Sequence, residues 1–78
     1  MDNRKNIDRY KNIFKEKLKE LRQERRFSQR TIAEALDIAV STYANWEQGR
    51  TEPSIYDIYR LIEIYDIEAN ELFDISEL

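Results

Sequence analysis

The chain has 78 residues, of which 37% are charged and 41% are hydrophobic, and its net charge is −3. This length fits one domain, and the presence of a single Gly and a single Pro favours a helical protein. Because the sequence contains neither Cys nor His, it excludes disulfides, zinc sites built from those ligands, and thiolate or imidazole catalysis. We therefore expect no cofactor, no metal site and no enzymatic activity.

The sequence also bears on the compartment. No apolar run approaches the roughly 20 residues that a membrane-spanning helix needs, and the N-terminal segment lacks the apolar centre of a signal peptide. The absence of Cys agrees with a reducing environment. We expect a cytoplasmic protein that does not bind a membrane.

Charge is distributed unevenly along the chain. Residues 1–30 contain eleven Lys and Arg against five acidic residues, a net charge of +6, whereas residues 31–78 contain two against eleven, a net charge of −9. The whole molecule is therefore not attracted to a polyanion, but the basic half can present one face to phosphate. The same Lys- and Glu-rich stretch is equally typical of a solvated helix surface.

The first predicted element is a helix from about residue 9 to residue 25, whose apolar residues recur with the spacing of one helical face. These residues are Tyr10, Ile13, Phe14, Leu18 and Leu21. Residues 1–8 form a polar N-terminal segment that either frays or extends this helix, and residues 9–78 form the domain.

Two short helices follow. The second helix begins after Ser28, whose hydroxyl can accept a hydrogen bond from a free N–H of the first turn. Residues 37–39 are too few to join distant elements, so they form a tight corner. The third helix spans residues 40–48 and ends at Gly49, because a left-handed residue after a helix end favours Gly. Two short helices joined by such a corner form a helix-turn-helix unit.

The fourth helix is capped by Ser54, with Asp57 in a weak variant of the capping box. We expect it to bury a stripe of apolar residues, namely Ile55, Ile58, Tyr59, Ile62 and Tyr65, widened by Leu61 and Ile64. A short fifth helix covers about residues 68–74. The predicted fold class is therefore all-α, a compact five-helix bundle that contains a helix-turn-helix.

The outward face of the third helix has an unusual composition for so charged a chain. Its residues are small or bear amides and hydroxyls, namely Val40, Ser41, Ala44, Asn45 and Gln48, and Glu47 is the only charged residue of the helix. Such side chains suit a helix that lies against base edges in a major groove, because amides pair with bases and small apolar groups contact thymine methyls. A face of low charge suits contact with another protein equally well.

Three segments between residues 14 and 73 together resemble the helix-turn-helix domain of the lambda repressor/Cro type, also called the Xre family. They are LKELRQERRFSQRTIAEAL, STYANWEQGRTEPS and IYRLIEIYDIEANELF. The resemblance rests on the Ser-Gln that opens the second helix, the Ala-x-x-Leu that follows, the Trp-Glu-x-Gly that closes the third helix, and the subsequent Pro-Ser. It implies a lambda repressor-like fold and binding to double-stranded DNA.

The resemblance also implies roles for individual residues. Base-reading positions fall on Val40, Ser41, Ala44 and Asn45, and phosphate contacts fall on Ser28, Gln29, Arg30, Gln48, Arg50 and Thr51. Asn45 is the first candidate, because its carboxamide can pair with both N6 and N7 of adenine. Glu47 is implied to form a structural, partly buried ion pair with Arg22.

Three positions depart from the family pattern. Asp37 stands where the corner has Gly, Ala39 where Ser or Thr caps the third helix, and Val40 where the first base-reading residue is polar or basic. The missing cap at Ala39 forfeits about 1 kcal/mol.

From these features we expect a sequence-specific DNA-binding transcriptional regulator, a repressor that binds an inverted-repeat operator as a homodimer with half-sites about 34–36 Å apart. The expected dimer interface consists of apolar residues in the fifth helix and the tail, namely Leu72, Phe73, Ile75 and Leu78. Because the chain ends too soon for a ligand-sensing domain, regulation is expected from abundance, a regulatory protein partner or a second chain.

Two alternatives stay open. One is the antitoxin of a toxin–antitoxin pair, which uses the same module and adds a toxin-binding surface. The other is a protein-interaction module that has lost DNA binding, which the negative net charge, Ala39 and Val40 favour.

Overall fold

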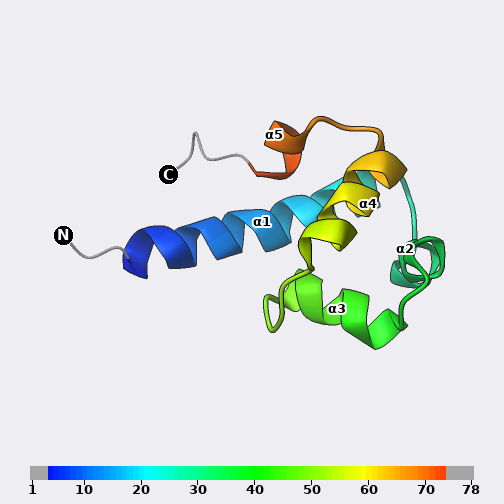
Figure 1. Cartoon of the computed structure of the whole chain (residues 1–78), viewed down its shortest axis with the longest axis horizontal. Helices are drawn as coiled ribbons and strands as arrows, with labels where there is room; N and C mark the ends of the chain where they lie inside the picture. Colours follow the sequence, from blue (N-terminus) through cyan, green and yellow to red (C-terminus); the bar gives the residue numbers. More distant parts are fainter. Residues whose placement is uncertain (1–3, 74–78) are drawn as a thin grey trace.

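The computed structural model describes residues 4–73 of the chain, and these residues form helices and short connections without a strand (Figure 1). The helices are α1 (Arg4–Glu24), α2 (Gln29–Leu36), α3 (Val40–Gln48), α4 (Ile55–Tyr65) and α5 (Ala69–Leu72). The predicted all-α bundle with a helix-turn-helix is therefore confirmed. No helix within the described part is long and apolar enough to cross a bilayer.

Helix α1 is longer than the sequence pattern indicated. It begins at Arg4 and not near residue 9, so within the described part the polar N-terminal segment extends the helix. The N-terminal part of α1 reaches past the ends of α3 and α4 (Figure 1). None of residues 7–13 is buried, whereas Phe14, Leu18 and Leu21 belong to the core.

The corner between α2 and α3 is built from backbone hydrogen bonds. Asp37 adopts the left-handed conformation at φ 57°, and the N–H groups of Asp37 and Ile38 donate to carbonyls of the last turn of α2. Helix α2 is capped by Ser28, whose Oγ accepts from the Thr31 N–H at 3.0 Å, whereas Ala39 gives α3 no side-chain cap. This corner therefore fixes the orientation of α3 relative to α2.

The hydrophobic core lies where the helices meet, with α1 packed against α3 and α5, and α2 packed against α3 and α4. Its buried members are Phe14, Leu18, Leu21, Ile32, Ala33, Leu36, Tyr43, Trp46, Leu61, Tyr65 and Leu72. The hydroxyls of Tyr43 and Tyr65 lie 3.1 Å apart and satisfy each other by a hydrogen bond within this core. The two Tyr side chains therefore join α3 to α4.

The predicted inward stripe of α4 is wrong at two positions. Ile55 and Tyr59 are 74% and 64% exposed, whereas Leu61 and Tyr65 are buried. The face that meets the core consists of residues 58, 61, 62 and 65, which keep the spacing i, i+3, i+4, i+7. Because α4 carries apolar residues around most of its circumference, its sequence alone did not distinguish this face from the neighbouring one.

The last helix is shorter than predicted and is a core element. Helix α5 ends at Leu72, whose side chain is 0% exposed beneath its own subunit, and residue 74 of the predicted helix lies outside the described residues. The ring of Phe73 stacks on Phe14 and Tyr10, with ring centroids 5.5 Å and 6.0 Å away. The expectation that Leu72 exposes apolar area for a dimer is therefore wrong, because α1 already covers this residue's side of α5.

Candidate nucleic-acid interface

The outward face of α3 is open. Ser41 and Gln48 are exposed, and Ala44 and Asn45 are half-buried, whereas Val40, also half-buried, packs against the hydrophobic core. Glu47, the only charged residue of α3, is turned inward and is buried. The face that α3 presents to solvent is therefore uncharged, polar and lined by small side chains.

The start of α2 contributes a second group of predicted residues. The Oγ of Ser28 is engaged by the cap to Thr31, and Arg30 is exposed. The carboxamide of half-buried Gln29 donates from Nε2 to Oε1 of Glu47 at 3.1 Å. Since an amide nitrogen carries two N–H groups, this bond orients Gln29 and leaves it one donor.

The segment after α3 contributes a third group. Gly49 adopts φ 76°, and the Arg50 N–H donates to the Asn45 carbonyl at 2.9 Å, which turns the chain sharply at the end of the helix. Gln48, Arg50 and Thr51 are all exposed at this turn. The structure therefore places these residues next to one another, directly beyond the open face of α3.

The ion pair between Arg22 and Glu47 is present and links α1 to α3. Arg22 Nε lies 2.6 Å from Glu47 Oε2, and Nη2 donates to Oε1 at 2.9 Å. The two side chains are 13% and 4% exposed. Arg22 Nη1 also donates to the carbonyl of Phe27 at 2.9 Å, at the end of the α1–α2 connection. One guanidinium therefore ties both the connection before α2 and the C-terminal end of α3 to α1.

Glu47 is held in its ionised form. Burial alone would raise the pKa of this carboxyl, but hydrogen bonds from Arg22, Tyr43 and Gln29 outweigh burial and lower the pKa below its ordinary value. The pKa of Tyr43 is raised, first by burial and then by its contacts with Tyr65 and Glu47. Tyr43 therefore stays a neutral donor beside the carboxylate.

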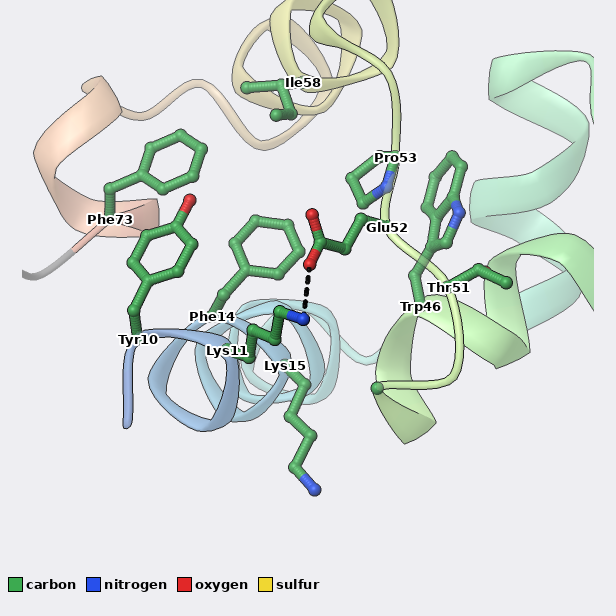
Figure 2. Close-up of a pocket in the computed structure, with 11 residues that line it drawn as sticks. Tyr10, Lys11, Phe14, Lys15, Trp46, Thr51, Glu52, Pro53, Ile58 and Phe73 are labelled. Carbon is green, nitrogen blue, oxygen red and sulfur yellow. Dashed lines mark ion pairs between the residues drawn. The ribbon is translucent and has the colours of Figure 1, made fainter. Parts of the chain in front are cut away.

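A small cavity lies between α1 and the α3–α4 connection (Figure 2). The rings of Tyr10, Phe14 and Phe73 gather on one side and Trp46 lies on the other, while an ion pair of 3.5 Å joins Lys11 to Glu52. Its volume of about 40 Å³ holds a few water molecules. Ligand sites need several hundred Å³, so this cavity does not mark a ligand site.

Sequence reasoning missed the position of Lys15. Its side chain lies across the C-terminal end of α3, where a Cβ on Gly49 would be only 3.1 Å from Lys15 Cδ. No sequence signal singled it out, because Lys15 is one of several lysines in a charged helix. The contact depends on how α1 crosses α3.

Comparison with known proteins identifies a matching family and fold. The family model described as "Helix-turn-helix" matches residues 18–72. The chain is 39% identical over 59 residues to the HTH-type transcriptional regulator DdrOP3 of Deinococcus deserti, a match that covers 76% of this chain and 46% of the relative. It is 29% identical over 65 residues to the cryptic phage CTXphi transcriptional repressor RstR of Vibrio cholerae, covering 83% and 59%.

A third relative is the HTH-type transcriptional regulator AnsR of Bacillus subtilis, 37% identical over 57 residues, with 73% of this chain and 49% of the relative covered. The chain thus spans about half the length of the curated relatives it matches. Among solved structures, the restriction-modification controller protein C.AhdI from Aeromonas hydrophila superposes with a TM-score of 0.75 at 33% identity, covering 81% of this chain and 96% of that chain.

Proposed function

We propose that this chain, which belongs to the helix-turn-helix family of the lambda repressor/Cro (Xre) type, binds double-stranded DNA sequence-specifically and represses transcription. One observation carries the proposal. In a chain with 37% charged residues, the outward face of α3 is uncharged and at least partly exposed to solvent within the described part. A bare helix face of amide, hydroxyl and methyl groups is suited to the edges of base pairs.

In this proposal α3 enters the major groove, and Val40, Ser41, Ala44 and Asn45 meet the bases. Asn45 supplies the bidentate pair with adenine, because its carboxamide offers a donor and an acceptor at once. The half-buried apolar side chains of Val40 and Ala44 supply contacts with thymine methyl groups. Base discrimination therefore rests on Asn45 more than on its neighbours.

The phosphate backbone is held from both sides of α3. The remaining amide donor of Gln29 and the side chain of Arg30 reach one phosphate at the start of α2, where the helix dipole also favours an anion. Gln48, Arg50 and Thr51 reach phosphates beyond the end of α3. Ser28 acts through its cap, because its hydroxyl is engaged with Thr31 and holds the first turn of α2 in place.

The active form is proposed to be a homodimer on an inverted repeat. Its interface is the exposed apolar face at the start of α4, here called the α4 patch, which consists of Ile55, Tyr56 and Tyr59, 74%, 66% and 64% exposed. These residues are neighbours at i, i+1 and i+4, so they form one contiguous surface. Phe73, which is half-buried, lies on the α1–α5 side, and Ile75 and Leu78 lie outside the described residues.

A second candidate function, a protein-interaction module without DNA binding, is favoured by the net charge of −3 and by the uncapped start of α3 at Ala39. The two functions differ in their response to salt. A dimer that neutralises several phosphates loses affinity steeply as salt rises, because each contact releases about 0.9 counterions. A protein-interaction module is expected to bind no DNA duplex even at low salt.

The test is selection of bound duplexes from a random pool at low salt, followed by titration of the best duplex at several salt concentrations. We expect enrichment of an inverted repeat whose half-sites lie about one helical turn apart, and a steep negative salt slope. A pool that stays random after repeated rounds would overturn the proposal and favour the interaction module.

A further inference from the structure

A polar groove runs between the N-terminal half of α1 and the end of α3. It has a volume of about 320 Å³ and is lined by Asp8, Lys11, Asn12, Lys15, Gln48 and Gly49. The four α1 residues stand at positions i, i+3, i+4 and i+7, so they share one face of that helix. Gln48 and Gly49 belong to the turn whose exposed residues include Arg50 and Thr51. The groove therefore continues the proposed phosphate-binding surface away from α3 and along α1.

Lys15 is the cation at the inner end of this groove. A Cβ on Gly49 would lie 3.1 Å from Lys15 Cδ and 3.9 Å from Nζ, so the missing side chain of Gly49 leaves the space that Lys15 occupies. Its ammonium is directed away from the aromatic side chains of the small cavity (Figure 2). Gly49 thus serves two purposes, since it turns the chain after α3 and lets a cation cross the helix end.

The two lysines along the groove differ in whether they form an ion pair. Lys11 forms an exposed ion pair with Glu52 at 3.5 Å, whereas Lys15 forms no ion pair within the described residues. Asp8 lies two turns from Lys15, at the outer end of the groove, where it repels an anion. The inner end, with Lys15, Asn12 and Gln48, is therefore the part of the groove that suits a phosphate.

We propose that Lys15, with Asn12 beside it, holds a DNA phosphate adjacent to the phosphates reached by Gln48 and Arg50, so that α1 extends the footprint beyond the helix-turn-helix. This inference rests on the proposed DNA binding. An ammonium suits a phosphate as a point charge, and the Asn12 amide adds a neutral donor. The contact carries no base information and acts on all sequences alike.

A purely structural role for Lys15 is the competing explanation. A cation near the C-terminal end of a helix stabilises it through the helix dipole. That role alters the stability of the fold but not the number of ions released on DNA binding. The salt dependence of binding therefore separates the two roles.

The test measures the dissociation constant of the selected duplex over a series of salt concentrations for wild type, Lys15→Gln and Lys17→Gln. Lys17 is the matched control, because it lies on the same helix in a different groove, beside Asn70 and Glu71 of α5. We expect Lys15→Gln to weaken binding several-fold and to reduce the salt slope by about 1 per half-site, and Lys17→Gln to leave the slope unchanged. Lys15→Arg keeps the charge and is expected to keep the slope.

Phosphate ethylation interference gives a second readout. In the wild type, ethylation of the phosphate held by Lys15 is expected to inhibit binding. We expect this inhibition to disappear in Lys15→Gln, at one phosphate per half-site, and to persist in Arg50→Ala. An unchanged slope and an unchanged ethylation pattern for Lys15→Gln, with normal binding by wild type, would overturn this inference and leave the proposed function intact. Failure of the wild type to bind any duplex would overturn both.

Discussion

Among single residues, Asn45 lies half-buried on the outward face of α3, where its carboxamide is proposed to meet a base edge. We predict that Asn45→Ala lowers discrimination at one base pair of each half-site by about 1–3 kcal/mol and leaves the fold intact. Competition between four duplexes that differ only at that base pair measures the effect. Asn70→Ala, which removes an exposed carboxamide from α5, is the matched control. Identical base preferences for Asn45→Ala and wild type would rule out this role.

Glu47 makes the stability of the fold depend on pH. Its pKa in the folded protein is lower than the ordinary value of 4.5, so ionised Glu47 stabilises the folded state. This contribution is fully present above pH 4.5 and is lost as the pH falls through the lowered pKa. We predict that Glu47→Gln flattens the acid side of the stability curve, measured by urea unfolding between about pH 7 and about pH 3.

The control for that experiment is Glu34→Gln, which changes an exposed carboxylate of α2. We expect this variant to follow the wild-type curve on acidification. If Glu47→Gln also followed the wild-type curve, the hydrogen bonds from Arg22, Tyr43 and Gln29 would not be what keeps Glu47 ionised.

At the scale of whole elements, the start of α3 is incomplete. Ala39 occupies the N-cap with extended backbone at φ −68° and ψ 145°, but it has no side chain that can accept an N–H of the first turn. We predict that Ala39→Ser raises the free energy of unfolding by about 1 kcal/mol, because Ser accepts such a bond without a change of backbone. Chemical denaturation of the two proteins measures the difference.

Ser28→Ala provides the reciprocal experiment, since Ser28 already caps α2 with a bond of 3.0 Å. It is expected to lose about 1 kcal/mol. A gain at Ala39 smaller than the error of the measurement would mean that solvent already satisfies the first turn of α3.

The elements that the sequence predicted well are those with local signals at their ends. Ser28 and Gly49 bound the helix-turn-helix, and α2 and α3 begin and end where these residues place them. The inward face of α4 was mispredicted at Ile55 and Tyr59, because this choice depends on how α4 meets the rest of the core and not on its own periodicity. The extension of α1 to Arg4 was left open because its first residues carry no apolar pattern.

Some contacts of the candidate site could likewise be predicted from the sequence, and others could not. The contact between Arg22 and Glu47 was indicated by the family pattern, since both residues stand at matching positions. The bond from Gln29 to Glu47 and the position of Lys15 over Gly49 involve side chains from separate helices. Their contact depends on the crossing of those helices, which no single stretch of the sequence encodes.

For the molecule as a whole, the α4 patch bears on assembly. Tyr56 is held in place, because Arg60 donates from Nη1 to its hydroxyl at 3.3 Å and from Nη2 to the Ala35 carbonyl at 3.0 Å. We predict that Tyr59→Glu converts a dimer into a folded monomer, because it places like charges opposite each other across a two-fold axis. Sedimentation equilibrium measures the mass, and circular dichroism verifies the helices.

The control is Glu63→Gln, which changes an exposed residue one turn further along α4. It is expected to remain dimeric. A Tyr59→Glu protein that sediments as wild type would exclude the α4 patch as the dimer interface.

The most direct measurement of whether α3 enters the groove is the change in backbone amide chemical shifts when the selected duplex is added to ¹⁵N-labelled protein. We predict the largest changes along Val40–Gln48, at Gln29 and Arg30, and at Arg50 and Thr51, with small changes in α5. Unchanged chemical shifts for the α3 amides, together with changed shifts in α4 or α5, would contradict the proposal that α3 enters the groove.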